Sequence, residues 1–426
     1  MPKYVIIGAS AAGIGAVEAI RDVDPVGPIA VISEEPCPQY SRPMISDFVS
    51  RKATFLEMMC RADDFWRKND VEALLGRKAT TINFPEKLVT LDNGERIAYE
   101  KLLIATGGKP FVPKIEGADK EGVFTFTTIS DAERLSEKLE NFRSIVVIGA
   151  GLIGVSVTEA LVKRGQKVTL VELQNKVLSL LMDANGSDII ENVMRKRGVT
   201  IVTGQSVQQI IGRTENDQIV GGVILTKGNR ISCDAVIIAI GVVPRTELVA
   251  GTEVKLNRGI IVDNFMQTNV KDVYASGDVA ETWDFTSNQN RLLPLWPLAM
   301  SQGKVAGYNM AGGKTEYAGG TNMSSLKYFG IPVVSIGITN PKDQTPFETL
   351  VKHEPEKNLY KKIVLKDNIA VGIMLVNDIE RAGTLFHLMK NRINVKKLKR
   401  ELLSEDFSLA VLPAFLRKTM CLGYAK

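Results

Sequence analysis

One arrangement of residues occurs twice in this chain and restricts its possible folds more than any other feature. In the first copy, a short apolar run at residues 4–7 is followed by the turn Gly8-Ala9-Ser10-Ala11-Ala12-Gly13 and by a helix-like segment at residues 14–21. A second apolar run at residues 29–32 ends close to the acid Glu34. This order predicts a βαβ unit with a carboxylate at the tip of its second strand.

The second copy repeats this order with a complete set of glycines. The apolar run at residues 145–148 leads into Gly149-Ala150-Gly151-Leu152-Ile153-Gly154, and a helix is expected at residues 155–164. The strand that follows, residues 167–171, ends at the acid Glu172. Two βαβ units with terminal acids indicate two dinucleotide-binding sites in one chain.

Each glycine of this pattern has a separate physical role. The first allows the sharp turn from strand to helix, the second lets the backbone approach a pyrophosphate, and the third lets the helix pack closely on the strand. The helix N-terminus offers free N–H groups and a positive dipole end, and the acid accepts hydrogen bonds from ribose hydroxyls. In the first copy Ser10 replaces the second glycine and adds only a small side chain. A flavin and a nicotinamide are the obvious pair of dinucleotides to react with each other.

The residues around Glu172 bear on the choice of nicotinamide cofactor. A carboxylate at this strand tip binds the ribose 2′-hydroxyl and repels a 2′-phosphate, and the next residues, Leu173-Gln174-Asn175, include no arginine to receive one. NAD(H) is therefore predicted over NADP(H). Lys176 is near enough in sequence to keep NADP(H) open as the alternative.

Three further turns follow strand-like segments. Residues 99–108 run from an apolar strand into Thr106-Gly107, and residues 234–244 repeat this arrangement around Gly241. Both are expected to be crossing points between domains. The motif Gly277-Asp278 places a carboxylate just past another strand, where it could bond a polyol.

The composition excludes several classes of protein. The 426 residues carry a net charge of +5, too weak to imply nucleic-acid binding, and include only two histidines, His353 and His387, so that a histidine-based metal site is not expected. Four cysteines, at positions 37, 60, 233 and 421, lack the spacing of a redox disulfide or a metal site. Neither a signal peptide nor a membrane span is visible, and a soluble, cytoplasmic protein is expected.

Taken in order, these motifs resemble a family: the two-dinucleotide-binding flavoprotein reductases of the pyridine nucleotide-disulfide oxidoreductase superfamily. Within it, the chain is most similar to NADH:rubredoxin reductases, the flavin part of assimilatory nitrite reductases, and NADH oxidases. The resemblance extends to a C-terminal strand at residues 360–365 with Gly372.

The resemblance implies an α/β fold with two Rossmann-like, three-layer dinucleotide-binding domains. An FAD domain at residues 1–110 and 245–320 would be interrupted by an NAD domain at residues 111–244. An α+β interface domain at residues 321–426 would follow, with a possible role in a homodimer or a heteromeric complex.

The resemblance also implies positions for FAD and NAD(H). FAD would lie along the first glycine turn with Asp278 on its ribityl chain, and NAD(H) along the second glycine turn and Glu172. No metal is implied. The residues expected to bind one or the other cofactor are Gly8, Ser10, Ala11, Ala12, Gly13, Glu34, Arg42, Pro43, Ser46, Thr106, Gly107, Gly149, Gly151, Leu152, Ile153, Gly154, Glu172, Gly241, Gly277, Asp278 and Trp296.

Two side chains, Glu159 and Trp296, each have a functional and a structural interpretation. In the family, a glutamate in the helix after the second glycine turn points toward the nicotinamide carboxamide, which makes Glu159 the catalytic candidate; otherwise it is an exposed helix carboxylate. Trp296 and Gln302, in a helix beginning near residue 293, are implied neighbours of the flavin, whereas Trp296 could instead be a core aromatic residue. Hydride transfer itself needs ring placement rather than an acid or a base.

The segment after the first βαβ unit indicates the branch of the family. In the family, disulfide reductases carry a redox cysteine there, as do the NADH oxidases and coenzyme A disulfide reductases that use a single redox cysteine. This chain instead has Pro38-Gln39-Tyr40-Ser41-Arg42-Pro43-Met44-Ile45-Ser46, with Cys37 preceding the Tyr-Ser-Arg-Pro sequence. Some relatives have a lysine directly after this serine, where the present chain has Asp47. Without a dithiol, the flavin is expected to pass electrons directly to an outside acceptor.

The leading hypothesis is an FAD-containing NADH:acceptor oxidoreductase that moves electrons between NAD(H) and an iron-sulfur or rubredoxin-like partner, alone or as the flavin subunit of a larger redox complex. One alternative is an NADH oxidase that reduces dioxygen, and another is a non-catalytic flavin-binding subunit. The basic run at residues 396–400 is either a solvated face or a docking patch for an acidic electron carrier.

Overall fold

The chain forms two compact units, each built from more than one stretch of sequence. This computed structural model describes residues 2–341, 345–404 and 407, and Cys421 lies outside them. The first unit comprises Met1–Phe111, Thr127–Glu137 and Gly241–Gly320, and the second comprises Val112–Phe126, Lys138–Ile240 and Thr321–Lys426.

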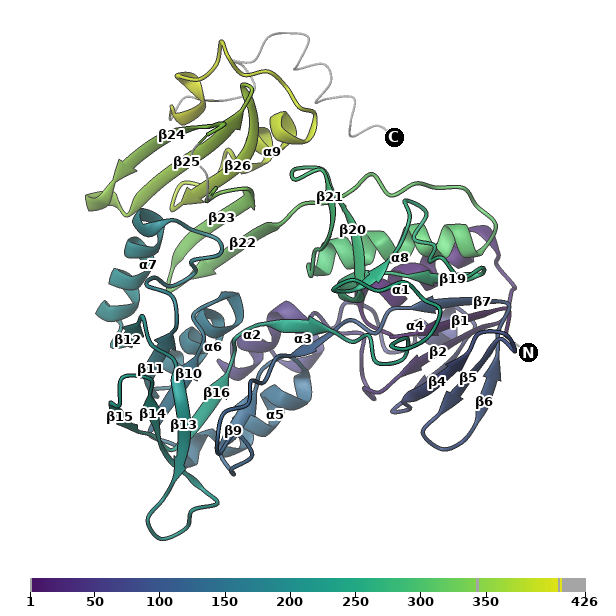
Figure 1. The fold of residues 1–426 in the computed structure, drawn as a ribbon, viewed down its shortest axis with the longest axis horizontal. Coiled ribbons are helices and arrows are strands. Elements are labelled where there is room, and N and C mark those ends of the chain that lie inside the picture. The colour runs from purple at the N-terminus through teal and green to yellow at the C-terminus, as the bar shows by residue number, and fades with distance from the viewer. Residues whose placement is uncertain (1, 342–344, 405–406, 408–426) are drawn as a thin grey trace. The chain divides into compact units, whose positions relative to one another are not determined.

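A five-stranded parallel sheet is the centre of the first unit (Figure 1). Its strands, in order across the sheet, are β19 (Val273–Ala275), β7 (Lys101–Ile104), β1 (Tyr4–Ile7), β2 (Ile29–Ser33) and β3 (Val71–Leu75). Every residue of β1 and β2 is buried, as expected for apolar strands that are covered on both faces. The parallel pairing of β1 with β2 confirms the first predicted βαβ unit.

Two helices of this unit pack closely against each other. Helix α1 (Ala11–Val23) begins within the glycine turn rather than at residue 14, because the residues from Ala11 onward already form its first turn. Helix α8 (Trp296–Met310) lies beside it (Figure 1). The shorter helices of this region are α2 (Ile45–Val49), α3 (Phe55–Met58), α4 (Phe65–Lys68) and α5 (Ile129–Lys138).

Three smaller sheets complete the first unit. The two predicted crossing segments pair with each other as antiparallel strands β8 (Gly108–Pro110) and β17 (Val242–Pro244). The other two sheets are β4 (Ala79–Asn83), β5 (Leu88–Leu91) and β6 (Arg96–Ala98), and β18 (Ile260–Ile261), β20 (Ala280–Asp284) and β21 (Gln289–Leu292).

The second unit contains the second predicted βαβ unit. Its five-stranded parallel sheet has the order β12 (Thr200–Thr203), β11 (Lys167–Glu172), β10 (Ser144–Ile148), β16 (Ala235–Ile238) and β9 (Val123–Thr125). Helix α6 (Leu152–Lys163) connects β10 with β11, and α7 (Ala184–Lys196) precedes β12. The unit also contains a three-stranded antiparallel sheet, formed by β13 (Val207–Gly212), β14 (Val220–Leu225) and β15 (Arg230–Ser232).

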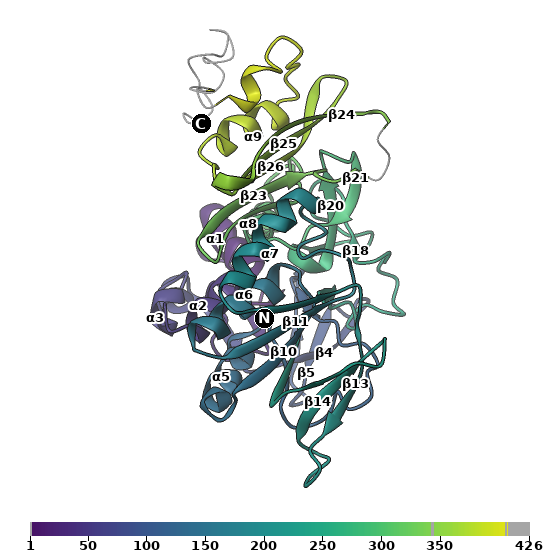
Figure 2. The ribbon, with the colours of Figure 1, turned by 90° about the vertical axis from the view of Figure 1, so that its left-hand side faces the viewer.

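The C-terminal part of the second unit is an antiparallel sheet with a helix. The strand order is β22 (Met323–Tyr328), β23 (Ile331–Gly337), β26 (Ile369–Val376), β25 (Leu359–Lys366) and β24 (Phe347–Glu354), and helix α9 (Ala382–Lys390) packs on β26. Figure 2 shows α6 and α7 next to this sheet. In the turn between β25 and β26, Asp367 and Asn368 have positive φ values of 53° and 60°. None of the helices in the described ranges is both long and apolar enough to cross a membrane.

Candidate functional site

The first glycine turn connects β1 to α1 with a backbone that requires glycine. Gly8 has a φ of +119°, and a Cβ at this position would lie 2.0 Å from the carbonyl oxygen of Ala105. Ser10 is the N-cap residue of α1, but its side chain makes no capping hydrogen bond. The first N–H groups of a helix lack intrahelical acceptors, so this turn presents donors of the kind that bind a pyrophosphate.

Residues from the last sequence stretch of the first unit, Gly241–Gly320, pack against this turn. A Cβ at Gly277 would lie 3.3 Å from Ala12 Cβ and 3.5 Å from Ala299 Cβ, and Trp296 packs on the same cluster of small residues. The structure therefore brings together four of the residues expected to bind FAD: Ala11, Ala12, Gly277 and Trp296.

Several polar groups of this region are buried without a protein partner. The Trp296 Nε1 donor and the Ser276 hydroxyl have no hydrogen-bond partner among the described residues. Burial raises the pKa of the Asp278 carboxyl to about 6, against the opposing effect of the Arg42 guanidinium. An unpaired buried polar group costs about 1–3 kcal/mol, so the Trp296 and Ser276 donors fit a ligand that has hydroxyl groups and ring heteroatoms. A flavin dinucleotide has both.

Gln302, a predicted neighbour of the flavin, supports the Gly277 turn from within the protein. Its side chain is buried, its Oε1 accepts a hydrogen bond from Gly277 N at 2.8 Å, and its Nε2 donates to Thr282 Oγ1 at 3.1 Å. The amide therefore fixes the backbone that carries Asp278.

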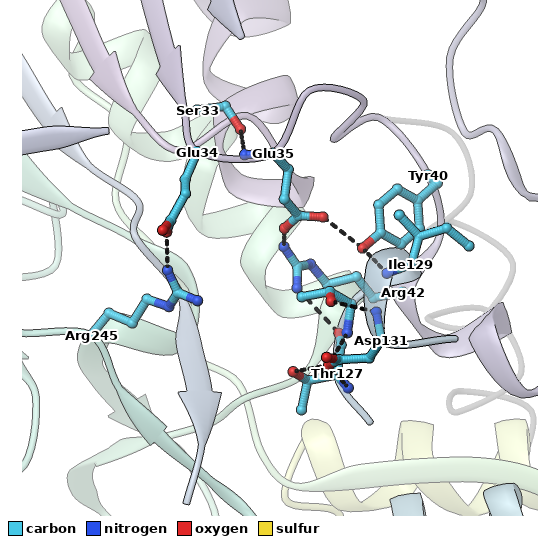
Figure 3. A network of polar contacts seen from close by, with 10 residues as sticks. Ser33, Glu34, Glu35, Tyr40, Arg42, Thr127, Ile129, Asp131 and Arg245 are labelled. Carbon is cyan, nitrogen blue, oxygen red and sulfur yellow. Dashed lines mark hydrogen bonds and ion pairs between the residues drawn. The ribbon is translucent and has the colours of Figure 1, made fainter. Parts of the chain in front are cut away.

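The acid at the tip of β2 meets a cation from another segment of the first unit. The exposed Glu34 carboxylate accepts a hydrogen bond from Arg245 Nη1 at 2.7 Å (Figure 3). It also lies 3.5 Å from Lys78 Nζ. Partial burial raises the pKa of the Glu34 carboxyl, but Arg245 and Lys78 lower it by more. The pKa of Glu34 therefore lies below its ordinary value. The Arg245 backbone is held by the predicted crossing turn, because its N–H donates to Gly107 O and its carbonyl accepts from Thr106 Oγ1.

Arg42 lies in a second network beside the first (Figure 3). It forms an ion pair with Glu35, and its Nη1 donates to Thr127 O at 3.2 Å. The Tyr40 hydroxyl donates to Glu35 Oε2 at 2.7 Å and accepts from Ile129 N at 2.9 Å. These contacts fasten residues 127–137, which fall in the range expected for the NAD domain, to the tip of β2 in the first unit.

The rest of the Arg-Pro segment forms two short helical turns. Pro43 is exposed and Ser46 half-buried, and Asp47 Oδ1 lies 3.1 Å from Lys52 Nζ. Sequence reasoning missed Glu35, Tyr40 and Arg245 as parts of this region. Arg245 could be noticed in the sequence only because it directly follows the crossing strand. No sequence pattern indicates the tertiary partners of Glu35 and Tyr40.

The second glycine turn has the same construction in the second unit. A Cβ at Gly154 would lie 1.8 Å from Gly149 O, so only glycine allows α6 to pack here. Gly151 is the N-cap residue of α6, and a Cβ at this position would meet nothing within 4 Å. Leu152 and Ile153 form the half-buried first turn. The open space beside Gly151 and the uncapped helix end fit the close approach of a pyrophosphate.

Glu172 is fixed beside this turn at the end of β11. Its Oε2 accepts from Ala150 N at 2.6 Å, and its Oε1 accepts from Gln174 N at 2.8 Å. The neighbouring Lys176 forms an ion pair with Asp188, which raises the pKa of the lysine. The cation that left NADP(H) open in the sequence thus already has a carboxylate partner.

Glu159, the catalytic candidate, is held by two protein contacts on α6. Its Oε1 lies 2.8 Å from Lys163 Nζ, and its Oε2 accepts a hydrogen bond from Phe329 N at 3.0 Å. A carboxylate has about four lone-pair positions, so acceptor capacity is left over. A contact with a nicotinamide carboxamide stays a prediction.

The surroundings of Cys37, His387 and His353 are typical of structural side chains. Burial, together with Asp63 and Glu133, raises the pKa of the Cys37 thiol and so disfavours the reactive thiolate. His387 lies in α9 with a buried Nε2 that has no partner in the described chain, and the His353 ring packs edge-on against Tyr360.

Comparison with known families places most of the chain in one of them. Residues 2–303 match the family model described as pyridine nucleotide-disulphide oxidoreductase. Residues 323–393 match the model described as the rubredoxin NAD+ reductase C-terminal domain.

Individual relatives cover the chain to different extents. The NADH-dependent phenylglyoxylate dehydrogenase subunit epsilon of Aromatoleum evansii is 30% identical, with 96% of each chain covered. The nitrite reductase [NAD(P)H] of Bacillus subtilis is 28% identical over 93% of this chain, which spans only 48% of that protein. The crystal structure of NADH:rubredoxin oxidoreductase from Clostridium acetobutylicum is 27% identical and superimposes with a TM-score of 0.76, covering 96% of this chain and 99% of that one.

Proposed function

Because the chain belongs to the pyridine nucleotide-disulphide oxidoreductase family, we propose that it moves electrons between NAD(H) and a one-electron carrier protein by way of bound FAD. One observation carries this proposal. Two uncapped helix N-termini follow glycine turns in the same chain, and each lies in a βαβ unit whose second strand leads to a carboxylate, Glu34 or Glu172. Bound FAD would accept a hydride from NADH and release electrons singly.

The first glycine turn and its surroundings would hold FAD. The N-terminus of α1 would bind the pyrophosphate, Glu34 would accept the ribose hydroxyls, and Asp278 would accept a ribityl hydroxyl. Trp296 would donate its free Nε1 hydrogen to the same ligand. This proposal assigns residues 1–110 and 245–320 to the FAD domain. The contacts of Arg42 with Glu35 and Thr127 would support that domain from one side.

The second glycine turn would hold NAD(H), within an NAD domain at residues 111–244. Glu172 would accept the ribose 2′-hydroxyl and would repel a 2′-phosphate. Lys176, the first cation in sequence after Glu172, is paired with Asp188, which supports NAD(H) over NADP(H).

An iron-sulfur or rubredoxin-like protein is the proposed acceptor. Cys37 is a free cysteine, and its raised pKa disfavours the thiolate that a thiol relay would need, which supports direct transfer from the flavin. The exposed Lys396 and Lys397 of the C-terminal domain, residues 321–426, would attract an acidic carrier. A cytoplasmic location and a place in a larger redox complex belong to the same proposal.

The acceptor is tested by steady-state turnover of the FAD-loaded protein with NADH. We expect a one-electron dye or rubredoxin to be reduced much faster than dioxygen. Oxygen uptake at a comparable rate would identify an NADH oxidase instead. A protein that binds FAD but reduces none of these acceptors would be a non-catalytic subunit.

A further inference from the structure

The loop at residues 173–183, which follows Glu172, is held by the C-terminal sheet of the same unit. The carbonyl oxygen of Leu181 accepts two hydrogen bonds, from Ser335 Oγ and from Thr339 Oγ1, both at 2.9 Å. Both hydroxyl-bearing residues are buried. A single carbonyl of the loop is therefore fixed by two residues at the end of β23.

The last residue of this loop, Asp183, forms a more strongly charged contact with the same sheet. Its Oδ2 accepts from Lys362 Nζ at 2.7 Å and from Tyr360 OH at 2.6 Å, and its Oδ1 accepts from Gly186 N at 3.2 Å, capping α7. The Lys362 side chain is only 9% exposed. Charge-assisted hydrogen bonds in such surroundings restrict geometry more than exposed ion pairs do.

The middle of the loop contacts the second glycine turn directly. Leu178 N donates to Ala150 O at 2.8 Å, and Ala150 N donates to Glu172 Oε2 at 2.6 Å. The backbone between Leu178 and Asp183 spans only a few residues. Glu172, the acid that would bind the ribose, is thus connected to Lys362 through Ala150 and the short segment from Leu178 to Asp183.

We propose that the C-terminal sheet is a positioning element of the nicotinamide dinucleotide site, and that Lys362 acts on this site through Asp183. The proposal rests on the function proposed above. Lys362 is a positioning residue, since it reaches the site only through the loop. Its loss would let the loop at residues 173–183 move away from Ala150 and would weaken dinucleotide binding without altering the flavin site.

The neighbouring residue of β25 offers a matched control. Lys361 is buried as well, with a side chain that is 4% exposed, and its Nζ lies 2.5 Å from Asp378 Oδ2. Its ion pair stays within the C-terminal sheet region, because Asp378 follows β26 closely. Replacing either lysine removes a buried cation from the same strand, but only Lys362 contacts the loop.

The test compares Lys362→Met with Lys361→Met in the full FAD-loaded chain. Calorimetric titration gives the Kd for NAD+, and turnover with a one-electron dye gives kcat and KM for NADH. For Lys362→Met we expect Kd and KM to rise about two- to thirtyfold with little change in kcat, the range found for mutations that couple to a distant site. For Lys361→Met we expect both constants to stay close to those of the unmodified protein.

Equal Kd values for the two variants would overturn the inference. If Lys362→Met does not fold, Tyr360→Phe is the milder variant, because it removes only the hydroxyl that contacts Asp183; it should raise Kd for NAD+ in the same direction, and an unchanged Kd would overturn the inference. The proposed function fails separately, when the unmodified protein does not bind NAD+ at all.

Discussion

Asp278 is the residue at which burial and ionisation oppose each other. Burial raises the pKa of its carboxyl to about 6, whereas an unfolded aspartate has a pKa of about 3.9. Between these values the folded chain holds a proton that the unfolded chain has lost. Ionisation of Asp278 therefore destabilises the folded chain as pH rises from about 4 to about 6, and the full cost persists above about pH 6.

The variant Asp278→Asn tests this cost in the FAD-free protein. Because a neutral amide needs no desolvation of a charge, we expect the variant to be more stable at pH 7.5 by about 2 kcal/mol. The gain should shrink to about 1 kcal/mol or less at pH 4.5. Urea unfolding at both values gives the two free energies. Asp119→Asn, at an exposed aspartate, is the control, and equal stabilities of Asp278→Asn and the unmodified protein at pH 7.5 would refute the argument.

Asp188 is the residue expected to limit the use of NADPH. Its ion pair occupies Lys176, so Asp188→Asn should free this cation for a 2′-phosphate. We expect the ratio of kcat/KM for NADPH to that for NADH to rise about two- to fivefold, in line with the strength of a part-exposed ion pair. The ratio should stay below one because Glu172 remains. The gain should disappear in the double variant Lys176→Met/Asp188→Asn, and a ratio unaffected by Asp188→Asn would speak against this role.

At the scale of elements, the sequence was most informative where strands are apolar throughout. The apolar run at residues 4–7 coincides with strand β1, because all four of its side chains are buried. Helices α1 and α6 begin earlier than expected because part of each glycine turn is already helical. Strands such as β4, with two consecutive exposed residues at Thr80 and Thr81, carry no alternation strong enough to be found.

The turn between β19 and β20 depends on α8 through one side chain. In Gln302→Leu, the Gly277 N–H and the Thr282 hydroxyl lose their partner inside the protein. An unsatisfied buried group costs about 1–3 kcal/mol, so we expect a lower Tm and weaker retention of FAD. Thermal unfolding and fluorescence of released FAD measure the two effects. Gln289→Leu, at an exposed position of β21, should change neither, and normal FAD retention in Gln302→Leu would contradict the assigned role.

At the scale of the whole molecule, local patterns predicted the two dinucleotide folds but not the contacts between distant segments. The glycine turns and their acids are contiguous in sequence, so that spacing alone reveals them. The ion pair of Arg245 with Glu34 and that of Lys362 with Asp183 each join segments far apart in the chain. Such pairs depend on how the sheets are assembled, and no residue pattern in a single sequence records them.

Anaerobic mixing of the FAD-loaded protein with NADH would show whether bound NADH reduces bound FAD. We expect rapid loss of the visible absorbance of oxidised flavin, and a slower loss with NADPH. Return of the absorbance on addition of a one-electron acceptor would complete the cycle. Flavin that keeps its absorbance in excess NADH would contradict the claim that the two glycine turns serve one electron-transfer reaction.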